Sequence, residues 1–323
     1  MEVLMASATL PKSAPSDKLV KDLLQAFDNL FGLHPGFRPV HAKGIMSSGT
    51  FTPSPAAAQL TRAPHAIRPS TPVTVRFSDF AGVPTIPDND PQGAGPRGVA
   101  VRFYLAEHVH TDIIGHSHNG FPVRTGEEFL EFARALAASG PTASKPTAIE
   151  KFFAGHPRAM QFATTPNPIP TSFARESFYA VTAFQFTSSK GESRFGRFQI
   201  RPEAGTEYLT PGAAAQKSAS FLVEELPRRF AAGPVKLRIL VQLAAEGDEV
   251  SDSSITWPDD REQIDFGTLT LTKIEDQTKL ELRKIIFDPI PRVDGIDPSD
   301  DPLIEIRSAL YLASGRRRRA ANA

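Results

Sequence analysis

Seven stretches rich in Val, Ile, Phe and Thr, separated by Gly, Pro or Asp turns, most constrain how this chain of 323 residues can fold. Runs of this composition between turn-forming residues predict β-strands. Helical patterns are inserted between several of them, which favours an α+β fold built on an antiparallel sheet that closes into a barrel. The seven stretches are residues 71–80, 97–106, 176–188, 194–202, 236–244, 265–274 and 279–287.

Amphipathic segments predict the helices around this sheet. Residues 16–32 place leucine and phenylalanine side chains on one helical face, with Ser16 as the cap. Thr125 and Glu128 form a capping box at the start of another helix. The proline-rich stretch 32–72 is predicted to be irregular. Further helices are expected at residues 147–163 and 213–233 and from about Pro302.

Composition limits the classes of function. Lys+Arg and Asp+Glu are both 36, a balance that argues against a nucleic-acid-binding protein. Cysteine is absent, which excludes disulfides, thiolate metal sites and a cysteine nucleophile. The start of the chain lacks the pattern of a signal peptide, and no apolar run is long enough to span a membrane, so we expect a cytoplasmic protein. We expect one domain over residues 1–323, with a flexible start at 1–15 and a basic end at 316–323.

The C-terminal stretch IRSALYLASGRRRRA, residues 306–320, places a phenol among arginines. On a helix, Arg307 and Tyr311 lie one turn apart, and Arg318 lies near the same face two turns later. A phenol has a pKa of about 10, so holding Tyr311 as phenolate at pH 7 needs roughly 4 kcal/mol. A guanidinium and a ferric ion could supply that stabilisation. The alternative is a surface helix that ends in solvated arginines.

Two segments carry histidines that could take part in chemistry. In RPVHAKG, residues 38–44, His41 stands three residues before a glycine, which suits a loop that aims an imidazole into a cavity. A lone histidine is also common in cores and on surfaces. Residues 108–118 hold four histidines in paired H-x-H spacing, which could bind zinc or form a polar loop after a strand. The stretch 87–98, PDNDPQGAGPRG, lacks the ending of a phosphate loop and is interpreted as a turn.

Taken together, these motifs resemble those of the haem catalase family. R-x-V-H-A-K-G at residues 38–44 resembles the distal histidine motif, and V-R-F-S at 75–78 followed by R-G-V-A-V-R-F-Y at 97–104 resembles two of its strands. R-x3-Y-x4-R at 307–316 is similar to the proximal tyrosine signature, and F-D-P-I-P-R-V-D-G-I at 287–296 to the approach to it. The resemblance implies a catalase-like β-barrel with surrounding helices and a buried haem b.

The resemblance also implies roles for individual residues. Tyr311 would be the axial ligand of the haem iron, with Arg307 keeping its oxygen anionic. His41 would be the distal acid–base group, oriented by Ser78. The implied haem contacts are Val40, Phe121 and Phe129, and the implied partners of the haem propionates are Arg38, Arg76 and Arg318.

The chain departs from the family pattern in two ways. It is shorter than typical catalases and resembles the small catalase-related peroxidases. The family's G-N-x-T-P asparagine, which donates a hydrogen bond to peroxide, is replaced here by GHSHNG. His116 stands at the asparagine position, with Asn119 three residues on. An imidazolium at His116 could donate the same hydrogen bond, whereas a neutral ring could present only an acceptor.

These observations predict a haem peroxidase that reduces organic hydroperoxides, and hydrogen peroxide weakly, in oxidative-stress defence. The expected partners are the peroxide and a small-molecule electron donor, with no nucleic acid or membrane, and a homodimer is one expected assembly. His116 is counted with His41 and Ser78 as catalytic. The alternatives are a true catalase, a hydroperoxide isomerase similar to allene oxide synthases, and a haem carrier or sensor without enzymatic activity.

Overall fold

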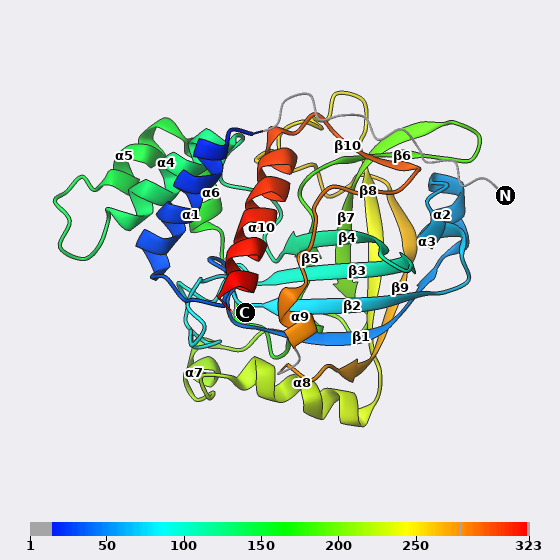
Figure 1. Cartoon of the computed structure of the whole chain (residues 1–323), viewed down its shortest axis with the longest axis horizontal. Coiled ribbons are helices and arrows are strands. Elements are labelled where there is room, and N and C mark those ends of the chain that lie inside the picture. Colours follow the sequence, from blue (N-terminus) through cyan, green and yellow to red (C-terminus); the bar gives the residue numbers. More distant parts are fainter. Residues whose placement is uncertain (1–14, 278–279, 322–323) are drawn as a thin grey trace.

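The computed structural model of the chain describes residues 15–277 and 280–321. Its sheet has ten strands in the order β10-β6-β7-β5-β4-β3-β2-β1-β9-β8, and a further pairing of β7 with β8 closes eight of them into a barrel (Figure 1). The predicted α+β fold with an antiparallel barrel is therefore confirmed. The strands are β1 (Gly44–Pro53), β2 (Thr71–Ser78), β3 (Gly98–Ala106), β4 (Val109–His116), β5 (Phe178–Tyr179), β6 (Phe184–Thr187), β7 (Ser193–Pro202), β8 (Val235–Leu243), β9 (Gln263–Ile274) and β10 (Ile296–Pro298).

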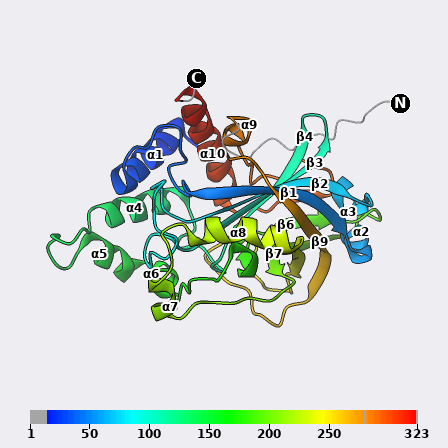
Figure 2. The ribbon, with the colours of Figure 1, turned by 90° about the horizontal axis from the view of Figure 1, so that it is seen from below.

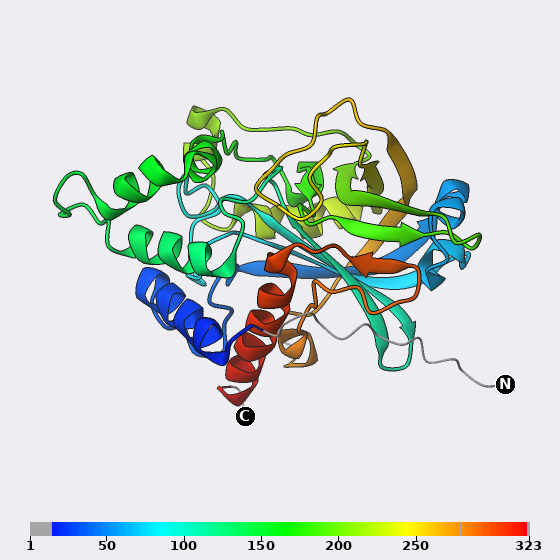
Figure 3. The ribbon, with the colours of Figure 1, turned by 90° about the horizontal axis from the view of Figure 1, so that it is seen from above.

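Helices cover the barrel unevenly. Helices α1, α4, α5 and α6 gather at one side, and α10 lies between them and the barrel (Figures 1 and 3). Helix α8 crosses the barrel on the face seen from below (Figure 2). In the described residues, none of the helices is long and apolar enough to cross a bilayer. The helices are α1 (Asp17–Phe31), α2 (Pro55–Leu60), α3 (Pro64–Ile67), α4 (Gly126–Ala137), α5 (Ala148–Gly155), α6 (Pro157–Thr164), α7 (Pro211–Ala215), α8 (Phe221–Ala232), α9 (Leu280–Lys284) and α10 (Pro302–Ala320), with a short 3-10 turn at Phe173–Arg175.

The interior of the barrel is filled by side chains. On β2, Val75 and Phe77 belong to a buried apolar cluster with phenylalanines of other strands, among them Phe51 and Phe266, whose rings stack 5.7 Å apart. Successive residues of a strand point to opposite faces. Arg76, between two core residues, therefore lies on the outer face of the barrel. Ser78, two residues further on, shares this outer face with Arg76, and both side chains line the cavity described below.

Three sequence predictions about strands were wrong. The stretch 32–72, predicted to be irregular, contains β1, which pairs with β2 and β9. The histidine segment 108–118, for which a polar loop was considered, is mostly β4, paired with β3. The described part of 279–287 is not a strand but helix α9 followed by extended chain. In each case the deciding interactions are with partners far away in sequence, which local composition does not report.

Two stretches that were each predicted to form a single strand or helix form two separate elements. The stretch 176–188 forms two short strands, β5 and β6, and residues 213–233 form two helices, α7 and α8. The predicted caps of α1 and α4 are confirmed, since Ser16 accepts from a main-chain N–H of its helix and Thr125 forms a capping box with Glu128. Residues 1–14 of the predicted flexible start and 322–323 of the basic end lie outside the described residues. The expectation of a single domain stays a prediction.

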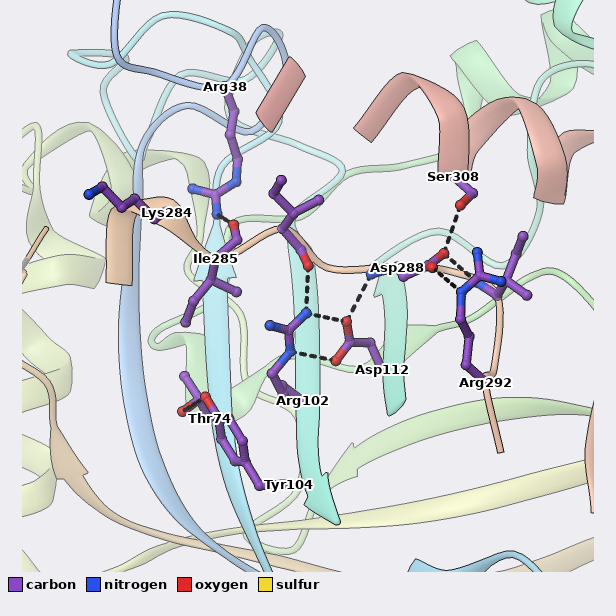
Figure 4. A network of polar contacts seen from close by, with 12 residues as sticks. Arg38, Thr74, Arg102, Tyr104, Asp112, Lys284, Ile285, Asp288, Arg292 and Ser308 are labelled. Carbon is purple, nitrogen blue, oxygen red and sulfur yellow. Dashed lines mark hydrogen bonds and ion pairs between the residues drawn. The ribbon is translucent and has the colours of Figure 1, made fainter. Parts of the chain in front are cut away.

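A segment that we call the strap, residues 285–288, runs between the barrel and α10 (Figure 4). Arg102 of β3 and Asp112 of β4 form a buried two-point ion pair, with nitrogen–oxygen distances of 2.9 and 2.7 Å. Asp112 also accepts a hydrogen bond from the main-chain N–H of Asp288 at 2.8 Å. The Asp288 carboxylate in turn accepts from Ser308 of α10 at 2.8 Å. These contacts hold the strap in place beside the site described next.

Candidate active site

Strand register places four residues in one row across the sheet. Ser78 of β2 pairs with Gly98 of β3, Gly98 with His116 of β4, and His116 with Tyr179 of β5. Residues aligned in this way across neighbouring strands share a face. All four residues line one cavity on the outer face of the barrel.

The cavity lies between the barrel, the strap and helices α1, α4 and α10. Its volume is about 210 Å³, and it opens to the solvent at its mouth. All eleven residues predicted for the site line it, although they come from widely separated parts of the sequence. These residues are Arg38, Val40, His41, Arg76, Ser78, His116, Phe121, Phe129, Arg307, Tyr311 and Arg318.

The position of His41 is set by contacts on three sides. Its main-chain N–H donates to the Phe80 carbonyl at 2.7 Å. Its ring Nδ1 lies 2.9 Å from the Asp79 carbonyl oxygen and 3.2 Å from the Ser78 hydroxyl. A Cβ atom at Gly98 would stand 2.8 Å from the ring, so only glycine leaves room for it. Since a carbonyl oxygen can only accept, Nδ1 carries the proton and Nε2 keeps a lone pair.

His41 is held in its neutral form. Burial, followed by the positive charge of Arg76, lowers the pKa of His41 to about 3. The Asp79 carbonyl works in the opposite direction, and Arg38 and Arg307 lower the pKa further. At neutral pH the ring is therefore an unprotonated imidazole, as a general base must be.

His116 has the opposite arrangement of ring nitrogens. Its Nδ1 accepts a hydrogen bond from the main-chain N–H of His118 at 3.3 Å. Its Nε2 is buried and has no hydrogen-bond partner among the residues that the structure describes. Burial and the neighbouring His118 lower the pKa of His116 to about 3. Asn119, the other candidate for the asparagine position, is not among the described residues that line the cavity.

Tyr311 faces the cavity from α10 with a guanidinium beside it. Arg307, one turn earlier, places Nε 3.4 Å and Nη2 3.5 Å from the Tyr311 hydroxyl oxygen. Nη1 of Arg307 donates to the Thr182 hydroxyl at 3.2 Å, which fixes the guanidinium between the helix and the barrel. A phenol oxygen that faces the cavity beside a fixed guanidinium is placed to act as a ligand for a ferric ion.

Three further arginines gather elsewhere on the cavity wall, of which Arg76 and Arg318 are buried and Arg38 is half-buried. Arg38 and Arg318 both donate to the Ile285 carbonyl, at 3.2 and 2.8 Å, and Arg76 donates to the His41 carbonyl at 2.9 Å. Burial and then the charges of Arg76 and Arg318 lower the pKa of Arg38. Burial and then Arg318 lower the pKa of Arg76 to about 9. Mutual repulsion of this kind is relieved by an anion, and a group with two carboxylates suits such a cluster.

These residues fit a haem. The cavity has a phenol with its guanidinium, a cluster of arginines for two propionates, and apolar side chains between them. The fit rests on these arginines, because no Asp or Glu is among the described residues that line the cavity, so their positive charge is left for an anionic ligand. No three His, Asp or Glu side chains within residues 15–277 and 280–321 come together as a metal site, which argues against zinc at 108–118.

Sequence reasoning missed several residues of the site. Ile285, Ile286 and Phe287 of the strap line the cavity, and so does Phe162 of α6. Only Phe287 belongs to a motif, as the first residue of the stretch 287–296, and the strap up to that residue was predicted to be a strand. For Gly98 a signal was present, because it belongs to the R-G-V-A-V-R-F-Y motif, but its role as the floor under His41 depends on strand pairing.

A second buried cluster lies behind His41, away from the cavity. Asp79 and Asp88 are fully buried, and Lys43 forms an ion pair with Asp88 at 2.5 Å. Burial, and then the charge of Asp88, raises the pKa of Asp79 to about 8. Arg97 is 3.8 Å from the Asp79 carboxylate, too far for a hydrogen bond, so its attraction is the weaker effect.

Comparison with known proteins identifies the family. A family model described as catalase matches residues 23–323. A catalase-related peroxidase of Mycolicibacterium paratuberculosis is 34% identical over 286 residues, which is 88% of this chain and 89% of the relative. One of Synechococcus elongatus is 32% identical over 301 residues, 92% of this chain and 87% of the relative.

Solved structures agree on the fold. A fungal catalase matches with a TM-score of 0.77 at 18% identity, covering 98% of this chain. A bacterial catalase matches with the same TM-score at 22% identity. This chain spans 66% of the fungal and 64% of the bacterial chain. From the family match, which covers nearly the whole sequence, we conclude that the chain belongs to the catalase family of haem-dependent oxidoreductases that act on peroxide.

Proposed function

We propose that this protein is a haem peroxidase that reduces organic hydroperoxides, and hydrogen peroxide more weakly, with electrons from small-molecule donors. The observation that carries the proposal is the cavity, which brings together a phenol with its guanidinium, three further arginines and a neutral imidazole. The two relatives named catalase-related peroxidase, at 34% and 32% identity, support the peroxidase activity.

In this proposal the cofactor is haem b. Tyr311 would hold the iron, with the Arg307 guanidinium beside its oxygen. Arg38, Arg76 and Arg318 bind the propionates through charge-assisted hydrogen bonds. When bound there, haem supplies the redox centre through which electrons from the donor reach the peroxide.

His41 is the proton carrier. Its Nε2 takes the O–H proton of the hydroperoxide as a general base and returns it to the leaving oxygen as a general acid, so that the organic product is an alcohol. The Asp79 carbonyl and the Ser78 hydroxyl keep Nδ1 occupied and the ring oriented. The donor supplies two electrons for each O–O bond that is reduced, and these, with two protons from the donor or the solvent, release the second oxygen as water.

The cavity wall favours a substrate with an apolar group. Phe121, Phe129, Phe132 and Phe162 all line the cavity, and Phe121 and Phe129 lie with ring centroids 5.0 Å apart. Apolar surface of this kind stabilises a bound alkyl or aryl group by removing it from water. Hydrogen peroxide has no such group, which is why it is proposed as the weaker substrate.

One set of initial rates separates this proposal from its alternatives. The haem-loaded protein is given cumene hydroperoxide or hydrogen peroxide, with and without a dye donor, while dye oxidation, peroxide and dissolved oxygen are followed. We expect dye oxidation that depends on both substrates and is faster with cumene hydroperoxide. Rapid oxygen release from hydrogen peroxide without dye would instead indicate a catalase, consumption of cumene hydroperoxide without dye or oxygen an isomerase, and no turnover a carrier.

The assignment of Tyr311 is tested by its spectrum. Tyr311→Phe removes the phenol oxygen and keeps the ring, so it should abolish the tyrosinate-type ferric spectrum and strongly reduce the haem retained after purification. Tyr179→Phe is the matched control, since its hydroxyl accepts from Arg201 at 2.9 Å instead of lying beside Arg307. An unchanged spectrum in Tyr311→Phe would overturn the assignment.

The proposal extends to the setting of the protein. We infer a role in oxidative-stress defence in the cytoplasm, with a homodimer as the assembly and with neither nucleic acid nor membrane as a partner. The zero balance of charge in the sequence supports the exclusion of nucleic acid. Light scattering of the haem-loaded protein gives its molar mass, which tests the homodimer. Repeating the measurement with duplex DNA tests whether nucleic acid is a partner, since binding would raise the molar mass.

A further inference from the structure

We propose that His116 is a fixed hydrogen-bond donor to the peroxide, because the main-chain N–H of His118 occupies Nδ1 and so confines the ring proton to Nε2. This inference rests on the proposed function and makes its distal side specific. It assigns to a neutral imidazole the part that an amide side chain plays elsewhere in the family. A neutral ring could have presented only an acceptor to the cavity, but the contact with His118 selects the tautomer that presents a donor.

The tautomer follows from hydrogen-bond chemistry. A neutral imidazole has one N–H and one lone pair. The His118 N–H can only donate, so the lone pair of His116 must be on Nδ1, 3.3 Å away, and the proton on Nε2. Nε2 is on the other side of the ring from the turn that holds Nδ1. It is buried, without a hydrogen-bond partner in the described part of the chain.

A buried N–H without a partner is costly, and such groups are rare in folded proteins. Here the ring lines the cavity beside the rings of Phe121 and Phe162, whose centroids are 6.4 and 6.2 Å away. Neither phenylalanine offers an acceptor oxygen or nitrogen. A ligand in the cavity that accepts a hydrogen bond would satisfy Nε2, which is the evidence that a ligand belongs there.

His41 and His116 have opposite tautomers and lie beside the same glycine. Strand pairing places His116 next to Gly98, and the His41 ring lies over Gly98, within 2.8 Å of where its Cβ would be. His41 offers a lone pair on Nε2, because its Nδ1–H is directed at the Asp79 carbonyl. One ring can therefore take a proton while the other donates a hydrogen bond.

This pair of tautomers matches a hydroperoxide. The R–O–O–H group has one O–H, which His41 can accept, and oxygen lone pairs, which His116 can engage. His116 donates without giving up its proton, so the proton transfer is carried by His41 alone. Because burial lowers the pKa of His116 to about 3, the donor is the neutral ring throughout the neutral pH range.

Fluoride binding tests this inference without turnover. Fluoride binds ferric haem and accepts hydrogen bonds but cannot donate them, so its dissociation constant reports donors in the cavity. Visible titrations of the haem-loaded protein compare wild type with His116→Leu and His116→Asn. We expect His116→Leu to weaken fluoride binding about tenfold or more, because a hydrogen bond to an anion is lost. His116→Asn keeps an N–H donor and should stay within about threefold of wild type.

Two comparisons make the test decisive. The fluoride dissociation constant of His116→Leu divided by that of wild type should stay the same from pH 5.5 to 8, because other groups that titrate in this range affect both proteins. A ratio that falls towards one as pH rises would show an imidazolium donor and overturn the fixed tautomer. Asn119→Ala should leave fluoride binding unchanged. If it weakens binding as much as His116→Leu does, or if His116→Leu has no effect, His116 is not the donor.

Failure of this inference can be told from failure of the proposed function. If Tyr311→Phe leaves the spectrum unchanged, or if the haem-loaded protein oxidises no donor, the proposed function is wrong. If donor oxidation and the spectrum of Tyr311→Phe behave as expected but His116→Leu binds fluoride as tightly as wild type does, only the inference about His116 is wrong. A correctly folded variant is recognised by its retained haem and ferric spectrum before the titration.

Discussion

His41 has a backbone φ of 59°, a left-handed conformation that residues with a Cβ adopt at a cost of about 1–3 kcal/mol. It persists because its surroundings fix it from several sides. The main-chain N–H of His41 donates to Phe80, Nδ1 faces Asp79 and Ser78, and the ring lies over Gly98. An imidazole held this way needs little reorganisation to accept a proton, which is the advantage of preorganised groups in catalysis.

Replacing His41 tests its role as the base. His41→Ala should retain haem but slow the reaction with peroxide by about a hundredfold or more, the usual contribution of a general acid–base group. Because the pKa of His41 is lowered to about 3, the wild-type rate should be level from about pH 5 to pH 8. Stopped-flow rates of the variant within a few-fold of wild type, or an acid limb centred near pH 6.5, would contradict this role.

Gly98 is expected to be as sensitive as the residues that take part in the chemistry. The added methyl of Gly98→Ala would stand 2.7 Å from the Ser78 hydroxyl and 2.8 Å from the His41 ring, so the ring must move. The reaction with peroxide should slow by about 10- to 100-fold, the scale of a small misplacement. Gly140→Ala, whose Cβ would have no heavy atom within 4 Å, is the control. Equal rates for the two variants would show that the ring has room to adjust.

At the scale of elements, helix α10 explains the run of arginines at the end of the sequence. At about 100° per residue, neighbouring arginines leave a helix in different directions. Arg317 makes a two-point ion pair with Asp28 of α1, at 2.6 and 2.9 Å, Arg318 enters the cavity wall, and Arg319 donates to the Lys284 carbonyl at 2.8 Å. Most of the run therefore ties α10 to its neighbours, and only Arg316 is left wholly to the surface.

Two arginines of this helix form a matched pair of variants. Arg318 is buried in the cavity wall, whereas Arg316 is exposed. Arg318→Ala should weaken haem binding by about 10- to 100-fold, through the loss of a charge-assisted hydrogen bond to a propionate. Arg316→Ala should leave it unchanged. Rates of haem transfer to an excess of a haem-scavenging protein measure the difference, and equal rates would mean that Arg318 has no part in holding haem.

At the scale of the whole molecule, the cavity occupies the boundary between two packed regions. One is the aromatic interior of the barrel, and the other is the apolar contact of α1, α4 and α10, which includes Leu23, Phe27 and Leu310. The site has buried ionisable groups on both sides, with His41 and His116 in the cavity wall and Asp79 behind it. Their pKa shifts couple the stability of the fold to pH.

Asp79 provides a test of this coupling. Its folded pKa of about 8 is above the 3.8 of an ordinary aspartate, so between these values the unfolded chain releases a proton that the folded chain keeps. This effect lowers stability as pH rises from about 4 to 8, by at most about 1.4 kcal/mol per pH unit. The lowered pKa values of His41 and His116 act in the opposite direction below about pH 6.5.

Comparing Asp79→Asn with wild type isolates the carboxyl from the histidines, which are present in both proteins. The unfolding free energy of Asp79→Asn minus that of wild type should increase as pH rises from 5 to 8, because only wild type loses stability through this carboxyl. Urea unfolding at several pH values, followed by tryptophan fluorescence, measures it. Asp297→Asn, a substitution at an exposed position, is the control and should show no such trend. A constant difference for Asp79→Asn across this range would show that the carboxylate is already ionised in the fold.

Local patterns in the sequence were enough to predict the α+β class, the caps of α1 and α4, the last helix and the eleven residues that line the cavity. Capping, helical periodicity and family motifs are properties of short segments, so they can be recognised without knowing what the segments pack against. The roles implied for the eleven residues stay predictions until the variants are measured.

The tertiary structure decided what depends on distant partners. It made β1 and β4 strands through their pairing, turned the end of the 279–287 segment into a strap held by Arg102 and Asp112, and gave His41 its left-handed backbone. For His116 the two scales combine, because a local contact, the main-chain N–H two residues away, selects the ring nitrogen that carries the proton. Whether that nitrogen then faces a ligand is set by burial and strand register, which no short stretch of sequence contains.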